Sequence, residues 1–257
     1  MGVKMKKRCT AVVLAAGGGS RMNSTVAKQF MMLGDKPLLW YSLQAVEGSE
    51  IIDDCILVTG KDSISYVKNA IVDQFGFHKV DRIVPGGRER WESVANAMAA
   101  MGSSDRRIPN RDGYVFIHDG ARPFLNDEIL RRTYEAVQEY HACVAAMPSK
   151  DTIKLADEGG MAVSTPDRRF VWSVQTPQVF DTELIVKAYG ALREKAEREG
   201  FEAVTVTDDA GVVEAFTNCP VKLVEGSYEN IKITTPEDMK IAEVFRERLL
   251  QYFKRLS

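Results

Sequence analysis

Apolar runs alternate with amphipathic stretches along most of this chain of 257 residues. Short apolar runs rich in β-branched residues predict buried strands at residues 11–15, 55–59, 82–84, 114–118 and 143–147. Longer stretches with a helical period predict helices at residues 37–46, 64–75, 91–101, 128–139, 182–199, 209–215 and 236–252. Residues 230–234 read as a further short strand. This order predicts an α/β fold, a mostly parallel sheet with helices on both faces.

One segment, residues 145–172, interrupts this alternation because it has no helical period. Two short apolar runs there flank the turn sequence Glu158-Gly159-Gly160, which predicts a two-stranded β-hairpin projecting from the sheet. An isolated hairpin is marginally stable in water, so we expect it to pack against a second subunit. The chain has no internal repeat and no flexible linker. We therefore expect one domain over residues 1–257, with residues 145–172 as a dimerisation arm.

The composition fits a soluble globular protein with a substantial core, since hydrophobic residues make up 45% and charged residues 27% of the chain. A formal net charge of -2 gives no reason to expect nucleic acid or an anionic membrane as a partner. Apolar stretches are too short for a signal peptide or a membrane span, so a cytoplasmic location is expected. The cysteines are too scattered for a zinc site or a disulfide framework and are expected to be buried thiols: Cys9, Cys55, Cys143 and Cys219.

The first predicted strand runs directly into the sequence Ala15-Ala16-Gly17-Gly18-Gly19. Glycines let backbone N–H groups approach phosphate oxygens, and Arg21 and Lys28 supply cations for a polyphosphate. The loop lacks the third glycine of a dinucleotide fingerprint, where Met22 stands, and it is not a Walker A loop. A tight turn with two solvated cations is the alternative. The combination of glycines and cations favours nucleotide binding.

A second glycine pair, Gly86-Gly87, also follows a predicted strand and precedes a predicted helix. Its backbone could offer donors and acceptors to a flat base, with Arg90 and Ser93 adding side-chain contacts. Taken alone, the same residues fit an ordinary loop before an exposed helix start equally well.

The predicted strand at residues 114–118 leads into His118-Asp119-Gly120-Ala121-Arg122. A carboxylate at the carboxyl end of a buried strand is suited to hold Mg²⁺ against phosphates, which is the interpretation we favour for Asp119. The alternative is that Asp119 caps the next turn and pairs with Arg122. Strand alternation directs His118 away from Asp119, so we interpret His118 as structural.

Other polar positions carry weaker signals. Strand alternation predicts that Lys232 faces a cleft or solvent, and Thr235 is placed to cap the last helix. Thr207-Asp208-Asp209 is most simply a helix N-terminus rich in acid, although a metal role stays open. Asp151-Thr152 and Arg168 bracket the predicted hairpin.

Over residues 11–243 the chain resembles the cytidylyltransferases of the bacterial isoprenoid pathway. Each matching fragment is short, and the specificity lies in their order and spacing. The fragments are Ala15-Ala16-Gly17-x-Gly19-x-Arg21-Met22, Lys28-Gln29-Phe30, Gly86-Gly87-x-Glu89-Arg90-x-x-Ser93, His118-Asp119-Gly120-Ala121-Arg122-Pro123, Asp151-Thr152, Gln175-Thr176-Pro177-Gln178, Thr207-Asp208-Asp209-Ala210, Val224-Glu225-Gly226 and Asn230-Ile231-Lys232.

This resemblance implies a Rossmann-like fold, a homodimer built through the arm, and transfer of CMP from CTP to 2-C-methyl-D-erythritol 4-phosphate with release of pyrophosphate. It implies nucleotide contacts from Ala15, Ala16, Gly17, Gly18, Gly19, Gly86, Gly87, Arg90, Ser93 and Gly120. It implies catalytic roles for Arg21, Lys28, Arg168 and Lys232, acceptor contacts from Asp119, Arg122, Thr152, Arg168 and Lys232, and Mg²⁺ on Asp119. Thr152 and Arg168 would come from the partner subunit.

The implied chemistry needs no general base, because a phosphate monoester is already largely ionised at neutral pH. The chain departs from the resemblance at Leu14, where many relatives carry proline, and at Arg88, where many carry aspartate. Two other functions stay open at this point. The first is a ribitol-5-phosphate cytidylyltransferase, although Ala15-Ala16 and residues 168–178 favour the methylerythritol phosphate as acceptor. The second is a non-catalytic nucleotide-sensing module, which would not need Asp119, Arg168 and Lys232 together.

Overall fold

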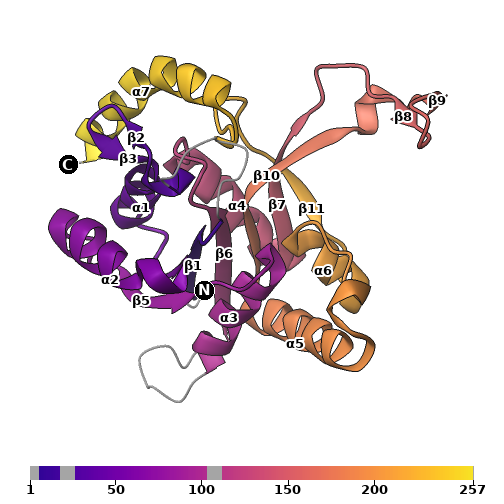
Figure 1. Cartoon of the computed structure of the whole chain (residues 1–257), viewed down its shortest axis with the longest axis horizontal. Coiled ribbons are helices and arrows are strands. Elements are labelled where there is room, and N and C mark those ends of the chain that lie inside the picture. The colour runs from indigo at the N-terminus through magenta and orange to yellow at the C-terminus, as the bar shows by residue number, and fades with distance from the viewer. Residues whose placement is uncertain (1–5, 18–26, 103–111, 257) are drawn as a thin grey trace, which may run out of the picture.

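A seven-stranded sheet forms the centre of the molecule in the computed structural model, which describes residues 6–17, 27–102 and 112–256. Its strand order is β11-β7-β10-β6-β1-β4-β5 (Figure 1). The strands are β1 (Arg8–Ala15), β4 (Asp54–Thr59), β5 (Val80–Pro85), β6 (Gly113–Asp119), β7 (Ala142–Pro148), β10 (Trp172–Asp181) and β11 (Lys222–Glu225). All neighbours pair in parallel except β10, which is antiparallel to both β6 and β7.

The register of the parallel strands brings three loops to one edge of the sheet. Leu14 near the end of β1 pairs with Asp119 at the end of β6, and Ala15 pairs with Thr59 at the end of β4. Thr59 in turn pairs with Pro85, directly before the second glycine pair. The carboxyl ends of parallel strands are where ligands gather in such folds. The expectation that both glycine loops and Asp119 emerge together is therefore confirmed.

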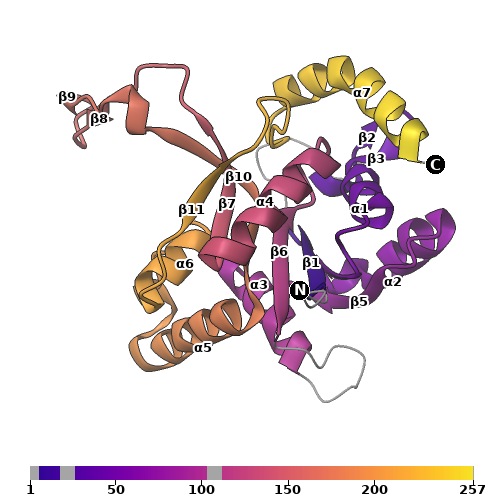
Figure 2. The ribbon, with the colours of Figure 1, turned by 180° about the vertical axis from the view of Figure 1, so that it is seen from behind.

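Helices cover both faces of this sheet, as the alternation predicted (Figures 1 and 2). One face packs against α1 (Leu38–Gly48), α2 (Ile64–Val67) with its π-helical continuation η4 (Lys68–Asp73), and α4 (Asp127–Tyr140). The opposite face packs against α3 (Arg90–Gly102), α5 (Thr182–Glu199) and α6 (Asp209–Phe216). The last helix, α7 (Pro236–Leu256), lies beside α1 and beside β2 (Met32–Leu33), which pairs with β3 (Lys36–Pro37).

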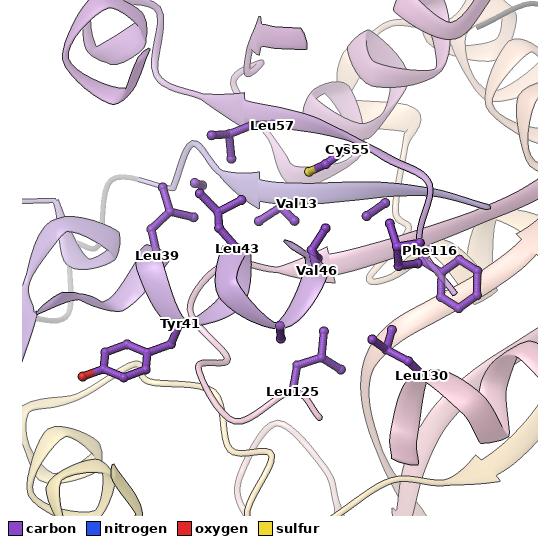
Figure 3. Close-up of a cluster of buried hydrophobic side chains, with 14 of the residues drawn as sticks. Val13, Leu39, Tyr41, Leu43, Val46, Cys55, Leu57, Phe116, Leu125 and Leu130 are labelled. Carbon is purple, nitrogen blue, oxygen red and sulfur yellow. The ribbon is translucent and has the colours of Figure 1, made fainter. Parts of the chain in front are cut away.

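The two hydrophobic cores follow from the two-residue period of the strands. In β1, Val13 packs on the α1 side of the sheet, whereas Val12 packs on the α3 side. On the α1 side, Leu39 and Leu43 of α1 lie over Val13 (Figure 3). Full burial of a leucine side chain stabilises a fold by about 1.5–3 kcal/mol. These layers therefore make the sheet a rigid support for the loops at its edge.

The structure corrects the prediction of a strand at residues 230–234. This segment pairs with no strand of the described residues and is instead anchored by the Ile233 N–H, which donates to the Ala121 carbonyl at 2.9 Å. Ile233 and Asn230 are nevertheless fully buried. Ile231 and Ile233 both pack against the core on the α1 side, so this extended segment has the two-residue period of a strand, which explains the error.

Strands β10 and β11 were not predicted from the pattern of apolar residues. Gln175, Pro177 and Gln178 interrupt the apolar run of β10, and the register shifts between Val174 and Gln178. The remaining short elements are η2 (Lys28–Phe30), β2 (Met32–Leu33), β3 (Lys36–Pro37), η3 (Lys61–Ser63), η5 (Arg168–Phe170) and η6 (Phe201–Ala203). Within the described ranges, every helix is too short or too polar to traverse a bilayer.

A hairpin projects from the sheet where the sequence predicts one (Figures 1 and 2). Its strands β8 (Leu155–Ala156) and β9 (Ala162–Ser164) pair antiparallel around a turn that contains Gly160, whose φ is 80°. The predicted limits need correction, because residues 145–148 belong to β7 and Trp172 begins β10. Since β7 and β10 belong to the central sheet, the arm itself comprises residues 149–171.

Candidate active site

Two adjoining cavities lie at the carboxyl edge of the sheet, with volumes of about 440 and 460 Å³. The first is lined by Leu14, Ala15, Ala16, Gly17, Lys28, Gln29, Gly87, Arg88, Glu89, Arg90, Ser93, Asp119, Ala121, Lys232 and Thr234. The second is lined by Arg90, Asp119, Arg122, Val144, Val174, Gln175, Thr176, Gln178, Thr207, Asp208, Ala210, Glu214, Val221, Leu223 and Lys232. Arg90, Asp119 and Lys232 belong to both linings, so they form the wall that the two cavities share.

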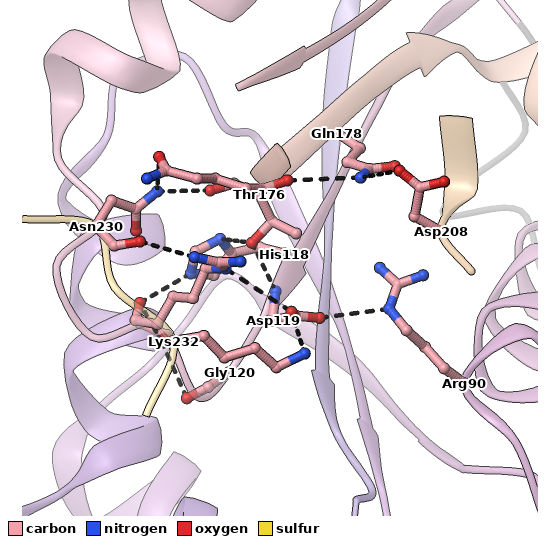
Figure 4. A network of polar contacts seen from close by, with 12 residues as sticks. Arg90, His118, Asp119, Gly120, Thr176, Gln178, Asp208, Asn230 and Lys232 are labelled. Atoms are coloured by element: carbon pink, nitrogen blue, oxygen red, sulfur yellow. Dashed lines mark hydrogen bonds and ion pairs between the residues drawn. The ribbon is translucent and has the colours of Figure 1, made fainter. Parts of the chain in front are cut away.

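Asp119 is the centre of this shared wall (Figure 4). The Nζ atom of Lys232 lies 2.8 Å from its Oδ2, and the Nε atom of Arg90 lies 3.5 Å from its Oδ1. Arg122 adds a third cation, its Nε 3.8 Å from Oδ2. Burial opposes ionisation of Asp119, but the charges of Arg90, Lys232 and Arg122 outweigh burial and hold the pKa of its carboxyl well below the usual value. Asp119 is therefore an anion at neutral pH, and it places three cations around one point.

His118 and Thr176 support Asp119 from behind (Figure 4). The Thr176 hydroxyl oxygen accepts the Asp119 N–H at 3.1 Å, and it lies 2.9 Å from Nδ1 of His118. The hydroxyl proton then goes to Nδ1, and Nε2–H of His118 donates to the Arg122 carbonyl at 3.1 Å. Burial lowers the pKa of His118 to about 4, so the ring is neutral. This confirms the structural interpretation of His118.

Arg90 is held by a partner that the sequence did not indicate. Its terminal nitrogens donate to both carboxylate oxygens of Asp209, at 2.9 and 2.6 Å. The Tyr189 hydroxyl donates to the same carboxylate at 2.6 Å. Burial works against the charge of Arg90, but the Asp209 carboxylate more than compensates and raises the pKa of the guanidinium. Arg90 lines the cavity, but its terminal nitrogens face Asp209.

The two glycine loops meet at the first cavity. A Cβ atom added at Gly86 would lie 2.3 Å from Cβ of Ala16, and the Gly86 N–H donates to the Thr59 carbonyl at 2.8 Å. Gly87 donates its N–H to the Ser93 hydroxyl at 3.0 Å. Gly86 itself does not line the cavity; it allows the close approach that positions Ala16. The described start of the first loop, residues 15–17, thus packs directly against the second.

Gly120 has a similar packing role. Its N–H donates to the Leu14 carbonyl at 2.8 Å, and a Cβ there would lie 3.0 Å from the same oxygen and 3.1 Å from Leu39 Cδ1. It lines neither cavity, so it lets the ends of β1 and β6 approach each other. Gly18, Gly19 and Arg21, also predicted at this site, lie outside the described residues.

Thr152 and Arg168 are two further predicted residues that, like Gly86 and Gly120, line neither cavity of this chain. Both are exposed on the arm, where Arg168 Nη1 donates to the Lys150 carbonyl at 3.2 Å. The arm extends away from the sheet (Figure 1).

Several polar residues of the site were not singled out individually from the sequence. Gln29 is buried and donates to the Ala15 carbonyl at 2.7 Å, which ties η2 to the end of β1. Gln178 donates to the Asp208 carboxylate at 2.9 Å and accepts the Ala210 N–H at 2.9 Å (Figure 4 shows the first contact). Asp208 also accepts the Gly211 N–H at 3.0 Å, which confirms it as the cap of α6. Glutamines inside otherwise apolar motifs were the available signal.

Binding of a magnesium ion at this edge of the sheet would depend on phosphate oxygens of a bound substrate. Among the described residues, no group of three or more His, Cys, Asp and Glu side chains gathers as a metal site. Mg²⁺ is commonly held by one or two carboxylates together with substrate phosphates. Asp119 fits the first part of that pattern, since it is the carboxylate residue that lines both cavities.

Comparisons with known proteins agree over nearly the whole chain. Residues 9–248 match the family model IspD, described as 2-C-methyl-D-erythritol 4-phosphate cytidylyltransferase. A protein of that name from Lachnospira eligens is 48% identical over 236 residues, covering 92% of this chain and 98% of the relative. One from Caldanaerobacter subterraneus is 44% identical, covering 92% and 97%. The crystal structure of 4-diphosphocytidyl-2C-methyl-D-erythritol synthase from Anaerococcus prevotii superposes with a TM-score of 0.75 at 32% identity, covering 95% of this chain and 97% of that one.

Proposed function

The chain belongs to the 2-C-methyl-D-erythritol 4-phosphate cytidylyltransferase family, and from that premise we propose how its two cavities perform the reaction. The enzyme transfers the cytidylyl group to 2-C-methyl-D-erythritol 4-phosphate in the non-mevalonate isoprenoid pathway. We assign CTP to the first cavity and the acceptor to the second. The observation behind this assignment is that Arg90, Asp119 and Lys232 line both cavities, so ligands in the two would meet at these side chains.

The first cavity suits a nucleotide because backbone and cations are combined in it. The triphosphate would lie along the loop that begins at Gly17, and Lys28 lines the same cavity. We assign Arg21 and the glycines at 18 and 19 to the same phosphates. The base would lie toward Gly87 and Ser93, where the Ser93 hydroxyl is already held by the backbone.

The reaction follows from the charges around Asp119. A phosphate oxygen of the acceptor attacks the α-phosphorus of CTP, and the bond from that phosphorus to the bridging oxygen breaks. The electron pair leaves with pyrophosphate. The attacking oxygen is largely deprotonated at neutral pH, because the second pKa of a phosphate monoester is about 6. Lys28 and Lys232 would then stabilise the charge that develops in the transition state.

We propose Mg²⁺ as the cofactor, held by Asp119 together with phosphate oxygens of the substrate. When bound, it would neutralise part of the charge of the triphosphate. Lys232 and Arg90 hold the Asp119 carboxylate ionised in advance, so this ligand is ready without a proton transfer.

A second subunit would complete the acceptor site. The arm exposes apolar side chains that are seldom left in water together, with Met161 70% and Phe170 79% exposed. We propose that two copies pair through residues 149–171. Each arm would then present Thr152 and Arg168 to the second cavity of its partner.

Pyrophosphate release tests the reaction. The purified protein is assayed with Mg²⁺ and with CTP, UTP, ATP or GTP, each paired with 2-C-methyl-D-erythritol 4-phosphate or D-ribitol 5-phosphate. We expect release only with CTP and the methylerythritol phosphate. Release with the ribitol phosphate would refute the acceptor assignment. Binding of CTP without release in any pair would favour a nucleotide sensor.

Mixed dimers test the shared site. Lys28→Ala and Arg168→Ala chains, each inactive alone, are co-expressed with different tags and the mixed dimer is purified. If Arg168 serves the partner's cavity, one of the two sites in the mixed dimer keeps both residues and activity returns to about half of the wild-type value. If Arg168 serves its own chain, no site is complete and the mixed dimer stays inactive.

A further inference from the structure

The fully buried carboxylate of Asp209 has no role in the function proposed above. It is the first residue of α6, is 0% exposed, and accepts three hydrogen bonds, two from Arg90 and one from Tyr189. Burial of a carboxylate is costly unless its oxygens are paired. Tyr189, which comes from α5, is itself 1% exposed. Three helices, α3, α5 and α6, therefore join at this one carboxylate.

Arg90 has two carboxylates within reach, and its geometry toward them differs. Both terminal nitrogens form a fork with Asp209, at 2.9 and 2.6 Å. Asp119 faces only the Nε side, at 3.5 Å (Figure 4). A guanidinium pairs most strongly with a carboxylate through two parallel N–H bonds. Asp209 thus binds both terminal nitrogens of Arg90, with which Asp119 would otherwise pair.

The consequence concerns Asp119. If Arg90 were free, it could turn and pair with both oxygens of Asp119, and that carboxylate would then be closed to a ligand. With Arg90 held by Asp209, the Asp119 oxygens keep one short contact, to Lys232 at 2.8 Å. Burial raises the pKa of Tyr189 well above its usual value, so its hydroxyl remains a donor that locks one oxygen of Asp209.

We propose that Asp209 and Tyr189 are positioning residues of the reaction: they hold the Arg90 fork away from Asp119, so that Asp119 stays accessible between the two substrates. This inference rests on the proposed assignment of CTP and the acceptor to the two cavities. Asp209 and Tyr189 line neither cavity, so they act only through Arg90.

A double-mutant cycle tests this dependence. The variants are Asp209→Asn, Arg90→Gln and the combination, assayed for pyrophosphate release at varied CTP and acceptor. We expect Asp209→Asn to lower kcat by about 10-fold to 100-fold. KM for CTP should change less than kcat, because Gly17, Gly87 and Ser93 of the nucleotide cavity stay in place. In the Arg90→Gln background, Asp209→Asn should lower kcat no further. Equal losses in both backgrounds would overturn the proposal.

A pair of tyrosine variants separates positioning from folding. Tyr41 matches Tyr189 because it is 0% exposed and its hydroxyl donates one hydrogen bond, to the Leu33 carbonyl at 2.6 Å, but it lines neither cavity. We expect Tyr189→Phe and Tyr41→Phe to lower the urea midpoint alike. Only Tyr189→Phe should lower kcat, by about 2-fold to 10-fold. A Tyr189→Phe variant with the kcat of Tyr41→Phe would refute the role of Tyr189.

The outcome for the wild-type enzyme separates this proposal from the proposed function. An active wild type with an additive cycle refutes the positioning role and leaves the function intact. A wild type that releases no pyrophosphate from CTP and the acceptor refutes the function, and the positioning role falls with it.

Discussion

Alanine at position 86 should damage the nucleotide cavity without unfolding the protein. Gly86 packs directly behind Ala16, and a Cβ atom added there would lie 2.3 Å from the Ala16 Cβ and 3.0 Å from the Ser93 hydroxyl oxygen. Gly86 does not have a positive φ, and its replacement by alanine removes no hydrogen-bonding group. The effect of Gly86→Ala is therefore purely a matter of space.

The size of the effect follows from these distances. Carbon atoms in contact are about 3.5–4.0 Å apart, so the two loops must separate by about 1.5 Å. The Ala16 methyl group has no rotamer by which to avoid the clash, so the backbone of its loop has to move. Overpacking of this kind costs about 1–3 kcal/mol, less than the stability of a typical domain. A shift of about 1 Å at a reactive site can cost about 100-fold in rate, or about 2.7 kcal/mol.

Steady-state kinetics with varied CTP and urea unfolding measure the two effects separately. We expect kcat/KM for CTP to fall about 100-fold in Gly86→Ala while the urea transition stays cooperative. Gly60→Ala is the matched control. It changes a loop glycine at the same edge, after β4, where an added Cβ would lie no closer than 3.6 Å to the Ser63 hydroxyl oxygen. Its kinetics should remain those of the wild type.

A second variant tests the cause. Ala16→Gly removes the methyl group that Gly86→Ala would meet, so the double variant should recover much of the lost kcat/KM. Wild-type kinetics in Gly86→Ala alone would refute the reasoning, because the contact would then not shape the cavity. Failure of Ala16→Gly to rescue would show that the lost activity has another origin.

Further predictions concern the phosphate cation, the anchor of the last helix and the arm. Lys28→Ala should lower kcat by about 10²–10³-fold with an unchanged urea midpoint, and an unchanged kcat would exclude its proposed role. Although burial works against it, hydrogen bonds from Thr234 and Thr235 hold the pKa of Asp238 below its usual 3.8. The ionised Asp238 carboxylate thus stabilises the fold above the usual pKa, and this stabilisation is lost as the pH falls through the lowered pKa. Asp238→Asn should lower the free energy of unfolding by about 1 kcal/mol at about pH 7. A difference in this free energy between wild type and variant that does not shrink in acid would contradict the prediction. Phe170→Asp should give monomers in sedimentation velocity and reduced turnover, whereas an intact dimer would argue against the arm as the interface.

Much of the candidate site could be predicted from local sequence. Asp119 ends an apolar run, and Gly17 and Gly87 follow two others, so the ends of three strands were visible as changes from apolar to small or charged residues. Since parallel strands end at one edge, their meeting followed from the predicted topology. Lys232 was expected to face a cleft or solvent, and it lines both cavities and contacts Asp119 at 2.8 Å, although residues 230–234 form no strand.

The pairing of charges could not be predicted in the same way. Arg90 and Asp209 are 119 positions apart, and nothing near either residue marks the other as its partner. Asp209 was interpreted as one acid of a helix N-terminus, and it does lie in the first turn of α6, but that position alone does not indicate its pairing with Arg90. Gly86 and Gly120 were expected to touch the nucleotide, and the close packing that they allow against Ala16 and the end of β1 was not predicted.

The periods, the ends of the strands and the kinds of charge at the sheet edge could be read from the sequence, because these depend on residues adjacent in the chain. Which cation pairs with which carboxylate depends on the packed fold. Three cations surround Asp119, and one of them, Arg90, pairs through its terminal nitrogens with a second, buried carboxylate, that of Asp209. That choice depends on burial and on distances between helices distant in sequence. Both arise only when the sheet and its helices are packed together.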